Sequence, residues 1–264
     1  MKNLVSIIMN CYNGEKYLEK SLESIITQNY TNWELIFWDN QSTDNSKKIF
    51  DRFSKPNFKY FLSEKHTTLY EARNLACERA KGEYIAFLDC DDVWHDNFLS
   101  QRELFFENKF YDYSYSNSYI FFEKSNNKVL HANKKLSSGL IYDFLAKEYL
   151  VAISSLIIKK KILKEIGPFN PTFNIIGDFD FVMKISKTKQ AFAIQNPLLQ
   201  IRIHGNNFHD KNRKMFFREF KNWFFNQIED SFFIRNKNFF FKKLVYLFIV
   251  SLFPVFIKDF FKKK

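Results

Sequence analysis

The chain has 264 residues, of which 46% are hydrophobic, so it can form one sizeable domain or a domain with an appendage, and it is not disordered. Its three cysteines show neither CxxC nor cysteine–histidine metal spacing and predict free thiols in a reducing compartment. The formal net charge is +11, but residues 211–264 alone carry +9, which argues against a nucleic-acid groove over the main body and predicts a basic appendage that meets an anionic surface.

The amino-terminal part alternates strand-like and helix-like segments. Residues 4–9 are apolar except for Ser6 and predict a buried strand, and polar residues from Asn10 onward interrupt the run, so a secretory signal is not expected. Apolar residues at helical spacing predict a first helix between residues 18 and 26. The pattern then repeats, with strands at 33–38, near 58–62 and at 84–88, and helices around 49–53 and over 70–81. This alternation predicts right-handed crossovers and a mostly parallel sheet.

Three aspartates, Asp89, Asp91 and Asp92, follow the strand at 84–88 in the sequence GEYIAFLDCDDVW. The strand is apolar at every position, which is typical of a central strand covered on both faces, and ligands of open α/β sheets bind outside such carboxyl ends. Like charges this close together predict a divalent cation, and an oxygen-rich set suits Mg²⁺ or Mn²⁺. The alternative is an acidic surface loop, with Asp92 near the positive end of a helix that begins near Asn97.

Polar residues also follow the first two strands. Tyr12 and Asn13 follow the first strand, and Asp39 and Asn40 follow the second. Together these strand ends could hold a nucleotide, with Tyr12 against the base and Asp39 accepting from a base or ribose donor. Ordinary turn and cap chemistry is the alternative, since Asn-Gly and Ser-Thr-Asp sequences are common in turns.

Three motifs occur in a fixed order in VSIIMNCYNGEKYLEKSLESIITQNYTNWELIFWDNQSTDNS and ARNLACERAKGEYIAFLDCDDVW. Their order and spacing resemble those of the family 2 glycosyltransferases, which are inverting enzymes that use nucleotide sugars and have the GT-A fold. The resemblance is strong over roughly the first 95 residues and is still legible to about residue 210.

The resemblance implies a set of donor contacts. The residues expected to bind the nucleotide sugar are Cys11, Tyr12, Asn13, Asp39, Arg73, Asp91 and Arg202. Asp91 and Asp92 are also expected to hold a metal, Mn²⁺ or Mg²⁺, on the diphosphate, and Asp89 has no assigned role. Many members carry two adjacent aspartates where this chain has Asp39-Asn40, so no second charge is expected there. For Arg73, a salt bridge on a helix surface is the alternative.

The segment FNIIGDFDFVMKIS resembles the part of the family that supplies the catalytic base. An inverting transfer needs one carboxylate to deprotonate the acceptor hydroxyl while the metal-neutralised diphosphate leaves from the other face of the sugar. Asp178 and Asp180 are two residues apart on a predicted helix and therefore point in different directions. Asp178 is the expected base, although Gly177 stands where the family usually has an acidic residue. The alternative is that Asp178 only caps the helix.

The second half is expected to contain strands at 110–122, 151–158 and 200–205, with a short helix at 159–166. On the last of these strands Arg202 and His204 share a face. The family often has a similar Arg-x-His close to the diphosphate, so His204 is expected to complete the metal shell or contact phosphate. A structural histidine is the alternative.

Residues 210–264 contain fifteen phenylalanines and form a basic tail. The apolar stretch at 244–257 is shorter than the ~20 residues that a helix needs to span a bilayer, and Pro254 interrupts it. An interfacial or re-entrant segment flanked by lysines is expected. A helix that covers the main body, or a dimer contact, is the alternative.

These observations predict an α/β protein with the GT-A fold over residues 1–210, divided into a nucleotide-sugar half (1–95) and an acceptor half (96–210), and a helical, membrane-associating tail over 211–264. The expected activity is metal-dependent, inverting transfer of a sugar from a UDP-linked donor to a glycan or lipid-linked acceptor in cell-surface polysaccharide synthesis. The protein is expected on the cytoplasmic face of the cell membrane, with no nucleic-acid partner. The alternatives are an interaction protein with a degenerate core and a nucleotidyltransferase.

Overall fold

A computed structural model of the chain describes residues 3–205 and 207–252. In the first half the elements are β1 (Val5–Cys11), α1 (Glu15–Ile26), β2 (Trp33–Asp39), α2 (Ser46–Phe53), β3 (Phe58–Leu62), α3 (Leu69–Arg79), β4 (Tyr84–Phe87), β5 (Val93–Trp94), η1 (Ser100–Arg102) and α4 (Glu103–Glu107). The elements that follow are β6 (Tyr113–Phe122), η2 (Glu123–Ser125), β7 (Asn127–Leu130), α5 (Tyr142–Lys147), η3 (Ile153–Ser155), β8 (Ile157–Lys159), α6 (Lys161–Glu165), α7 (Gly177–Ser186), β9 (Ala191–Ile203), α8 (Phe208–Lys211), α9 (Arg213–Asn226) and α10 (Ser231–Leu252).

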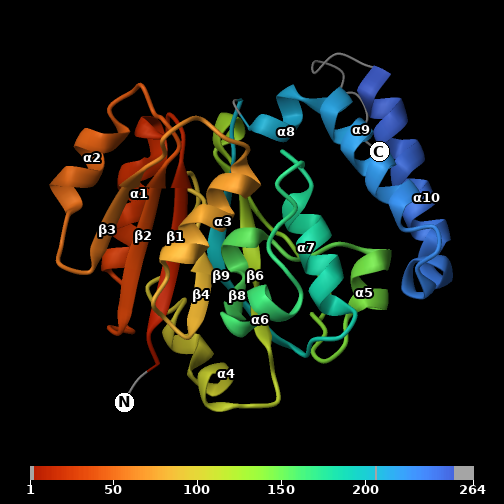
Figure 1. Cartoon of the computed structure of the whole chain (residues 1–264), viewed down its shortest axis with the longest axis horizontal. Helices are drawn as coiled ribbons and strands as arrows, with labels where there is room; N and C mark the ends of the chain where they lie inside the picture. Colours follow the sequence, from red (N-terminus) through yellow and green to blue (C-terminus); the bar gives the residue numbers. More distant parts are fainter. Residues whose placement is uncertain (1–2, 206, 253–264) are drawn as a thin grey trace.

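The described strands form one sheet in the order β3-β2-β1-β4-β8-β6-β9-β5, with β7 paired to β6. β3, β2, β1 and β4 are parallel to one another, as the alternation of strands and helices predicts. Figure 1 shows β1 rising from the amino terminus, so the carboxyl ends of these strands share the upper edge of the sheet. The polar residues that follow β1, β2 and β4 therefore meet along one edge.

The second half of the sheet is mixed. β8 runs antiparallel to β4 and to β6, whereas β9 runs parallel to β6. β9 begins at Ala191, well before the predicted start at residue 200, and it continues through Pro197 because the pairing with β6 shifts register around Asn117. The predicted strand at 151–158 is paired only from Ile157, and η3 precedes it.

Helices cover both faces of the sheet, and alternate residues of each strand enter different cores. On β1, Val5, Ile7 and Met9 pack with α1, α2 and α4, whereas Ile8 faces the opposite core with α3, α5 and α7. Every residue of β1 and β2 is buried. This two-sided burial explains why these strands are apolar without alternation and why they hold the strand ends rigidly in place.

The helices α9 and α10 pack beside α5 and α7, at the end of the molecule opposite α2 (Figure 1). Phe220 and Trp223 of α9 and Phe233, Phe240 and Leu247 of α10 are buried in the same core as α3 and α7. The predicted boundary at residues 210–211 thus falls before two helices that share the core of the main body, and the division into domains stays a prediction.

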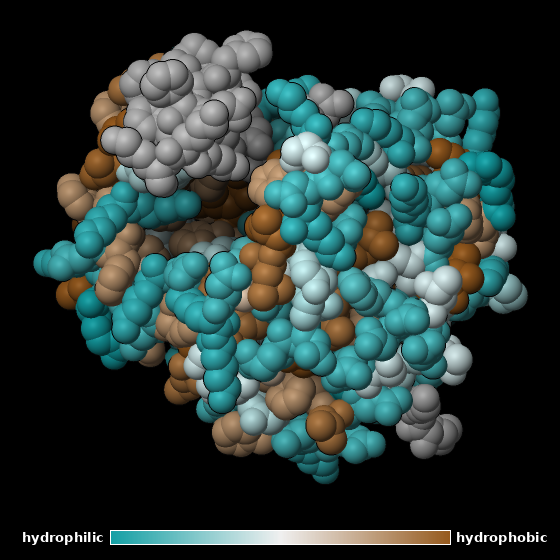
Figure 2. Space-filling view, turned by 180° about the vertical axis from the view of Figure 1, so that it is seen from behind, coloured by the Kyte–Doolittle hydropathy of each residue, from teal (hydrophilic) through white to brown (hydrophobic). Residues whose placement is uncertain are grey.

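No helix within the described residues is long and apolar enough to cross a membrane. The predicted Pro254 break and the basic carboxyl terminus lie outside the described residues. On α10, an outward stripe of apolar residues consists of Phe241, Val245, Phe248 and Leu252, all of them exposed. In Figure 2, hydrophobic and hydrophilic residues lie side by side along the edge of the molecule that contains α9 and α10.

Candidate active site

Asp91 and His204 meet at the carboxyl edge of the sheet, although 113 residues separate them in the sequence. The Nε2 atom of His204 lies 3.0 Å from Oδ2 of Asp91. The Asp91 side chain is 29% exposed and that of His204 is 7% exposed. A carboxylate and an imidazole that point at the same place, with one side open to solvent, form a site that can take a small cation.

Asp92, the expected partner of Asp91 in metal binding, is placed differently. It is buried, and its two carboxylate oxygens accept hydrogen bonds from the Ser154 hydroxyl at 2.6 Å and from the Arg202 backbone N–H at 3.0 Å. Burial raises the pKa of Asp92 well above its ordinary value. Asp92 thus joins the loop after β4 to η3 and to β9 and supports the position of Asp91, and its role in binding the metal stays a prediction.

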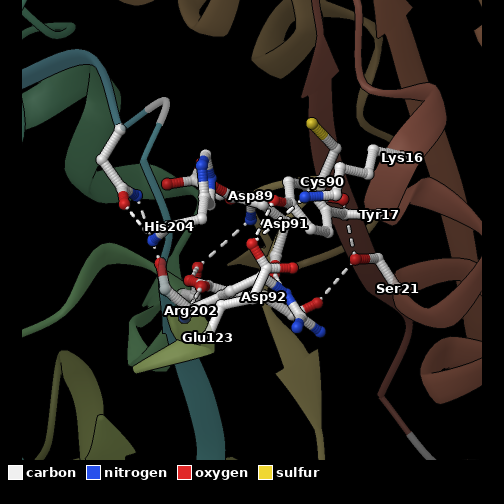
Figure 3. A network of polar contacts seen from close by, with 12 residues as sticks. Lys16, Tyr17, Ser21, Asp89, Cys90, Asp91, Asp92, Glu123, Arg202 and His204 are labelled. Carbon is white, nitrogen blue, oxygen red and sulfur yellow. Dashed lines mark hydrogen bonds and ion pairs between the residues drawn. The ribbon is translucent and has the colours of Figure 1, made fainter. Parts of the chain in front are cut away.

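Arg202 completes this arrangement. Its Nε donates to the Asp91 backbone oxygen at 3.1 Å, and its guanidinium lies 4.9 Å from the centre of the Tyr17 ring. The same Tyr17 ring lies 4.6 Å from the His204 ring, and its hydroxyl donates to Glu123 at 2.9 Å. Figure 3 shows these side chains converging from α1, β9 and the loop after β4.

Tyr17 and Glu123 were not expected from the sequence. Tyr17 lies between Lys16 and Leu18 on a helix whose apolar stripe starts at Leu18, and nothing in that pattern marks it. Glu123 lies in η2, at the end of a strand from the other half of the chain. Only the folded sheet brings them together.

Arg73 is buried and forms an ion pair with the half-buried Asp89, with Nη2 of Arg73 at 2.6 Å from Oδ1 of Asp89. The expected alternative of a surface salt bridge is wrong, because the Arg73 side chain is only 2% exposed and its guanidinium lies over the rings of Tyr70, Phe87 and Phe169. Burial raises the pKa of Asp89 to about 6, and the Arg73 cation opposes that rise. The ion pair therefore fixes the side chain of Asp89, a residue to which the sequence assigned no role.

Asp178 lies in the first turn of α7 and faces this ion pair. Its Oδ1 accepts from the Tyr70 hydroxyl at 3.1 Å and from the Phe179 backbone N–H at 2.7 Å. Burial raises the pKa of Asp178, and the nearby Arg73 cation opposes that rise. Asp180 points elsewhere and accepts from Nε1 of Trp223 on α9 at 3.1 Å. The two carboxylates diverge, as their spacing predicts.

A steric contact explains why position 177 is a glycine. A Cβ atom at this position would lie 2.4 Å from Cδ2 of Tyr70, closer than carbon atoms can approach. The Tyr70 ring therefore occupies the space of any side chain at position 177. The departure from the family pattern at Gly177 follows from the residue that holds Asp178 in place.

The nucleoside end of the expected site lies at β1 and β2. The Tyr12 side chain is 53% exposed, and its ring lies 4.3 Å from that of His66. Asp39 is buried and accepts from the Ser42 N–H at 2.7 Å and from the Tyr60 hydroxyl at 2.7 Å. The exposed Tyr12 ring next to a fixed carboxylate is suited to a base and ribose.

Three other residues at this end make contacts within the protein. Asn40 accepts from the Thr67 N–H and donates to the Thr67 oxygen, which an aspartate could not do. Asn13 has a positive φ of 53° and accepts from the Thr43 N–H. Cys11 is buried. Among the predicted loop residues 11–13, the Tyr12 side chain is thus the one best placed to meet a ligand.

The donor set fits a divalent metal that is bound together with a substrate. No group of three or more His, Cys, Asp or Glu side chains in the described part of the chain could hold a metal alone. Asp91 and His204 supply two ligand atoms, and Mg²⁺ and Mn²⁺ commonly take the remainder from phosphate oxygens and water. These two residues therefore suit a metal carried by a diphosphate.

Comparisons with known proteins identify the family of the chain. The model of the family described as "Glycosyl transferase family 2" matches residues 6–185. The chain is 29% identical over 218 residues to the UDP-Glc:alpha-D-GlcNAc-diphosphoundecaprenol beta-1,3-glucosyltransferase WfgD of Escherichia coli, a match that covers 80% of this chain and 83% of WfgD. It is 30% identical to the uncharacterized glycosyltransferase MJ1057 of Methanocaldococcus jannaschii, covering 97% and 91% of the two chains.

Two solved structures share the fold at low sequence identity. TarS 1-349 of S. aureus in complex with UDP-GlcNAc superposes with a TM-score of 0.69 at 20% identity, covering 86% of this chain and 67% of that one. The mannosyltransferase PcManGT of Pyrobaculum calidifontis, in complex with GDP-Man and Mn2+, gives a TM-score of 0.68 at 14% identity, covering 96% and 74%. Free TarS 1-349 extends beyond the match, since this chain covers 66% of it.

Proposed function

This chain belongs to the family 2 glycosyltransferases, has the GT-A fold and acts in glycan synthesis, and from that premise we propose that it is an inverting enzyme that transfers a sugar from a UDP-linked donor to a lipid-linked saccharide. The observation that carries the proposal is the convergence of Asp91–His204, Arg73–Asp89 and Asp178 on one edge of the sheet. Family membership argues against the nucleotidyltransferase alternative.

We assign donor binding to the strand ends of the first half. Tyr12 packs against the base, Asp39 accepts from the base or ribose, and the diphosphate lies toward Asp91 and Arg202. Asp91 and His204 would hold a divalent metal, Mn²⁺ or Mg²⁺, which would supply the positive charge that neutralises the leaving diphosphate. Asp92 supports this site from within the protein, through Ser154 and the Arg202 N–H.

Asp178 is the proposed catalytic base. Tyr70 holds its Oδ1, and the second oxygen is left to accept the proton of the acceptor hydroxyl. Because burial raises the pKa of Asp178, the carboxylate is a stronger base than an exposed aspartate, while the Arg73 cation keeps it from being protonated too readily. The hydrogen bond of Asp180 to Trp223, on the side of α9, supports the choice of Asp178 over Asp180.

The lipid-linked acceptor is supported by the relatives. WfgD and the related WfaP, both of Escherichia coli, are named for an acceptor whose diphosphate is joined to undecaprenol. An acceptor on a lipid lies at a membrane surface. The outward stripe on α10 and the net charge of +9 on residues 211–264 fit docking on the anionic, cytoplasmic face of a membrane.

The activity is tested with the purified protein and a panel of UDP-, GDP- and dTDP-sugars. We expect Mn²⁺-dependent hydrolysis of one UDP-sugar in the absence of acceptor, and faster transfer to a synthetic polyprenyl-diphosphate saccharide. Full activity in EDTA would contradict the proposed metal dependence. A protein that binds none of these donors would instead favour the alternative of an interaction protein with a degenerate core.

The membrane contact is tested by exposed substitutions that leave the core intact. Val245→Ser with Leu252→Ser should weaken sedimentation with phosphatidylglycerol vesicles, and binding should fall with salt. Neutral phosphatidylcholine vesicles are the control. Unchanged sedimentation of the double variant would contradict the docking, and a concentration-dependent dimer that this variant loses would assign the stripe to a second copy of the chain.

A further inference from the structure

Cys11 and Cys90 come together at the donor edge from neighbouring parts of the sheet. β1 and β4 are paired in parallel with Ile8 opposite Phe87, and the Leu88 N–H donates to the Ile8 oxygen at 3.1 Å. Cys11 is the last residue of β1, and Cys90 lies in the loop that follows β4.

The two sulfur atoms point into the same space. A Cβ atom built on Gly14 would lie 2.8 Å from Sγ of Cys11 and 3.0 Å from Sγ of Cys90. Both thiols thus face the one position in this turn that lacks a side chain. The neighbouring Cys90 thiol lowers the pKa of the Cys11 thiol.

We propose that Cys11 and Cys90 are an oxidative modification site, at which a peroxide converts the two thiols into an intramolecular disulfide that closes the donor site. The Cys11 thiolate attacks one oxygen of the peroxide and becomes a sulfenic acid, while the other oxygen leaves as hydroxide and takes up a proton as water. The Cys90 sulfur then attacks the sulfenic sulfur, and a second water leaves. Two thiols are oxidised by two electrons and one peroxide is reduced.

The third cysteine serves as an internal reference. Cys77 is buried on α3, and burial raises the pKa of its thiol to about 12. It therefore stays a protonated, unreactive thiol. Cys11 is buried as well, and it differs from Cys77 in having the half-buried Cys90 as a partner that lowers its pKa.

The disulfide changes the site because both cysteines belong to its loops. Cys11 precedes Tyr12, and Cys90 lies between Asp89 and Asp91. A sulfur–sulfur bond of about 2.05 Å brings the two sulfur atoms closer than they lie as thiols and ties the Tyr12 loop to the loop that carries Asp89 and Asp91. A shift of about 1 Å in a site costs on the order of 10²-fold in rate. The bond itself is independent of the proposed function, but its effect on the donor rests on that function.

The experiment treats the fully reduced, full-length protein with hydrogen peroxide and digests it without reduction. We expect mass spectrometry to find a linked peptide pair that contains Cys11 and Cys90 and has lost two hydrogens. Calorimetry with UDP should show affinity lower by about tenfold or more, restored by dithiothreitol. Cys90→Ser should form no link and keep its UDP affinity in peroxide, and Cys11→Ser should also form no link.

Cys77→Ala is the matched control and should remain as sensitive as the unaltered chain. The proposal is overturned if methionines oxidise while Cys11 and Cys90 stay reduced, if the links that form involve Cys77 or a second chain, or if the Cys11–Cys90 link leaves UDP affinity unchanged. If the reduced protein does not bind UDP, the proposed function fails instead, and the linked peptide still decides whether the modification site exists.

Discussion

The nucleoside end and the metal end of the site are built differently. At the nucleoside end, Tyr12, Asp39 and His66 come from consecutive βα units of one parallel sheet. At the metal end, Asp91 depends on His204 and Arg202, which are more than 100 residues away in the sequence. The first end forms with the parallel half of the sheet, whereas the second exists only when β9 has paired. Donor binding and transfer should therefore respond to different substitutions.

The largest difference between the effect on transfer and the effect on donor binding is expected for a substitution in α7. Asp178→Asn keeps the hydrogen bond from Tyr70 but cannot accept a proton, so transfer should fall by roughly 10²-fold or more while UDP affinity stays within experimental error. Steady-state rates and calorimetry measure the two quantities. Asp180→Asn is the control and should keep most of the activity. Loss of activity in Asp180→Asn alone would assign the base to the wrong carboxylate.

Substitutions of the adjacent residues Asp91 and Asp92 should affect different properties, metal binding for Asp91 and stability for Asp92. Asp91→Asn removes charge from a partly exposed side chain, so Mn²⁺ affinity in the presence of UDP should fall by about tenfold or more with little change in Tm. Asp92→Ala leaves the Ser154 hydroxyl and the Arg202 N–H without their acceptor. The free energy of unfolding should therefore fall by about 1–3 kcal/mol. Titration with Mn²⁺ and thermal unfolding decide between the two roles. A stable Asp92→Ala with lost metal affinity would return Asp92 to the metal shell.

Tyr17 should matter at the metal end alone. Tyr17→Leu removes the ring between His204 and Arg202. A lost aromatic contact costs about 1 kcal/mol of binding free energy, so KM for the metal–donor complex should rise several-fold. Tyr17→Phe keeps the ring and loses only the hydroxyl bond to Glu123. We expect it to restore most of the affinity. Equal losses in both variants would show that the Glu123 bond, and not the ring, positions the site.

The smallest expected effect is a shift in pH dependence. Asp178 must be ionised to accept a proton, so activity should be lost as the pH falls through its raised pKa. The Tyr70 hydroxyl lowers that pKa by donating to the carboxylate, and Tyr70→Phe should therefore move the acidic limb of kcat/KM to higher pH. An unmoved limb in Tyr70→Phe would mean that another group controls it.

Sequence patterns predicted the parallel half of the sheet well. Strands buried on both faces are apolar throughout, and the polar residues after β1, β2 and β4 stand out for that reason. The patterns could not distinguish Asp91 from Asp92, because adjacent residues of one type differ only in what the fold places against them. Ser154 and Arg202, which occupy the oxygens of Asp92, are contacts between distant segments. Proline is rare inside strands, so Pro197 likewise kept the sequence pattern from predicting that β9 begins at Ala191.

The close approach of Tyr70 to Gly177 couples the residue types that these two positions can hold. With tyrosine at 70, any side chain at 177 collides with the ring. An acidic residue at 177, which is common in the family, requires a smaller residue at 70, and that replacement removes the hydroxyl that binds Asp178. A lineage can move between the two solutions only through an intermediate that is crowded or lacks a hydrogen bond. We therefore expect relatives with tyrosine at position 70 to carry glycine at position 177.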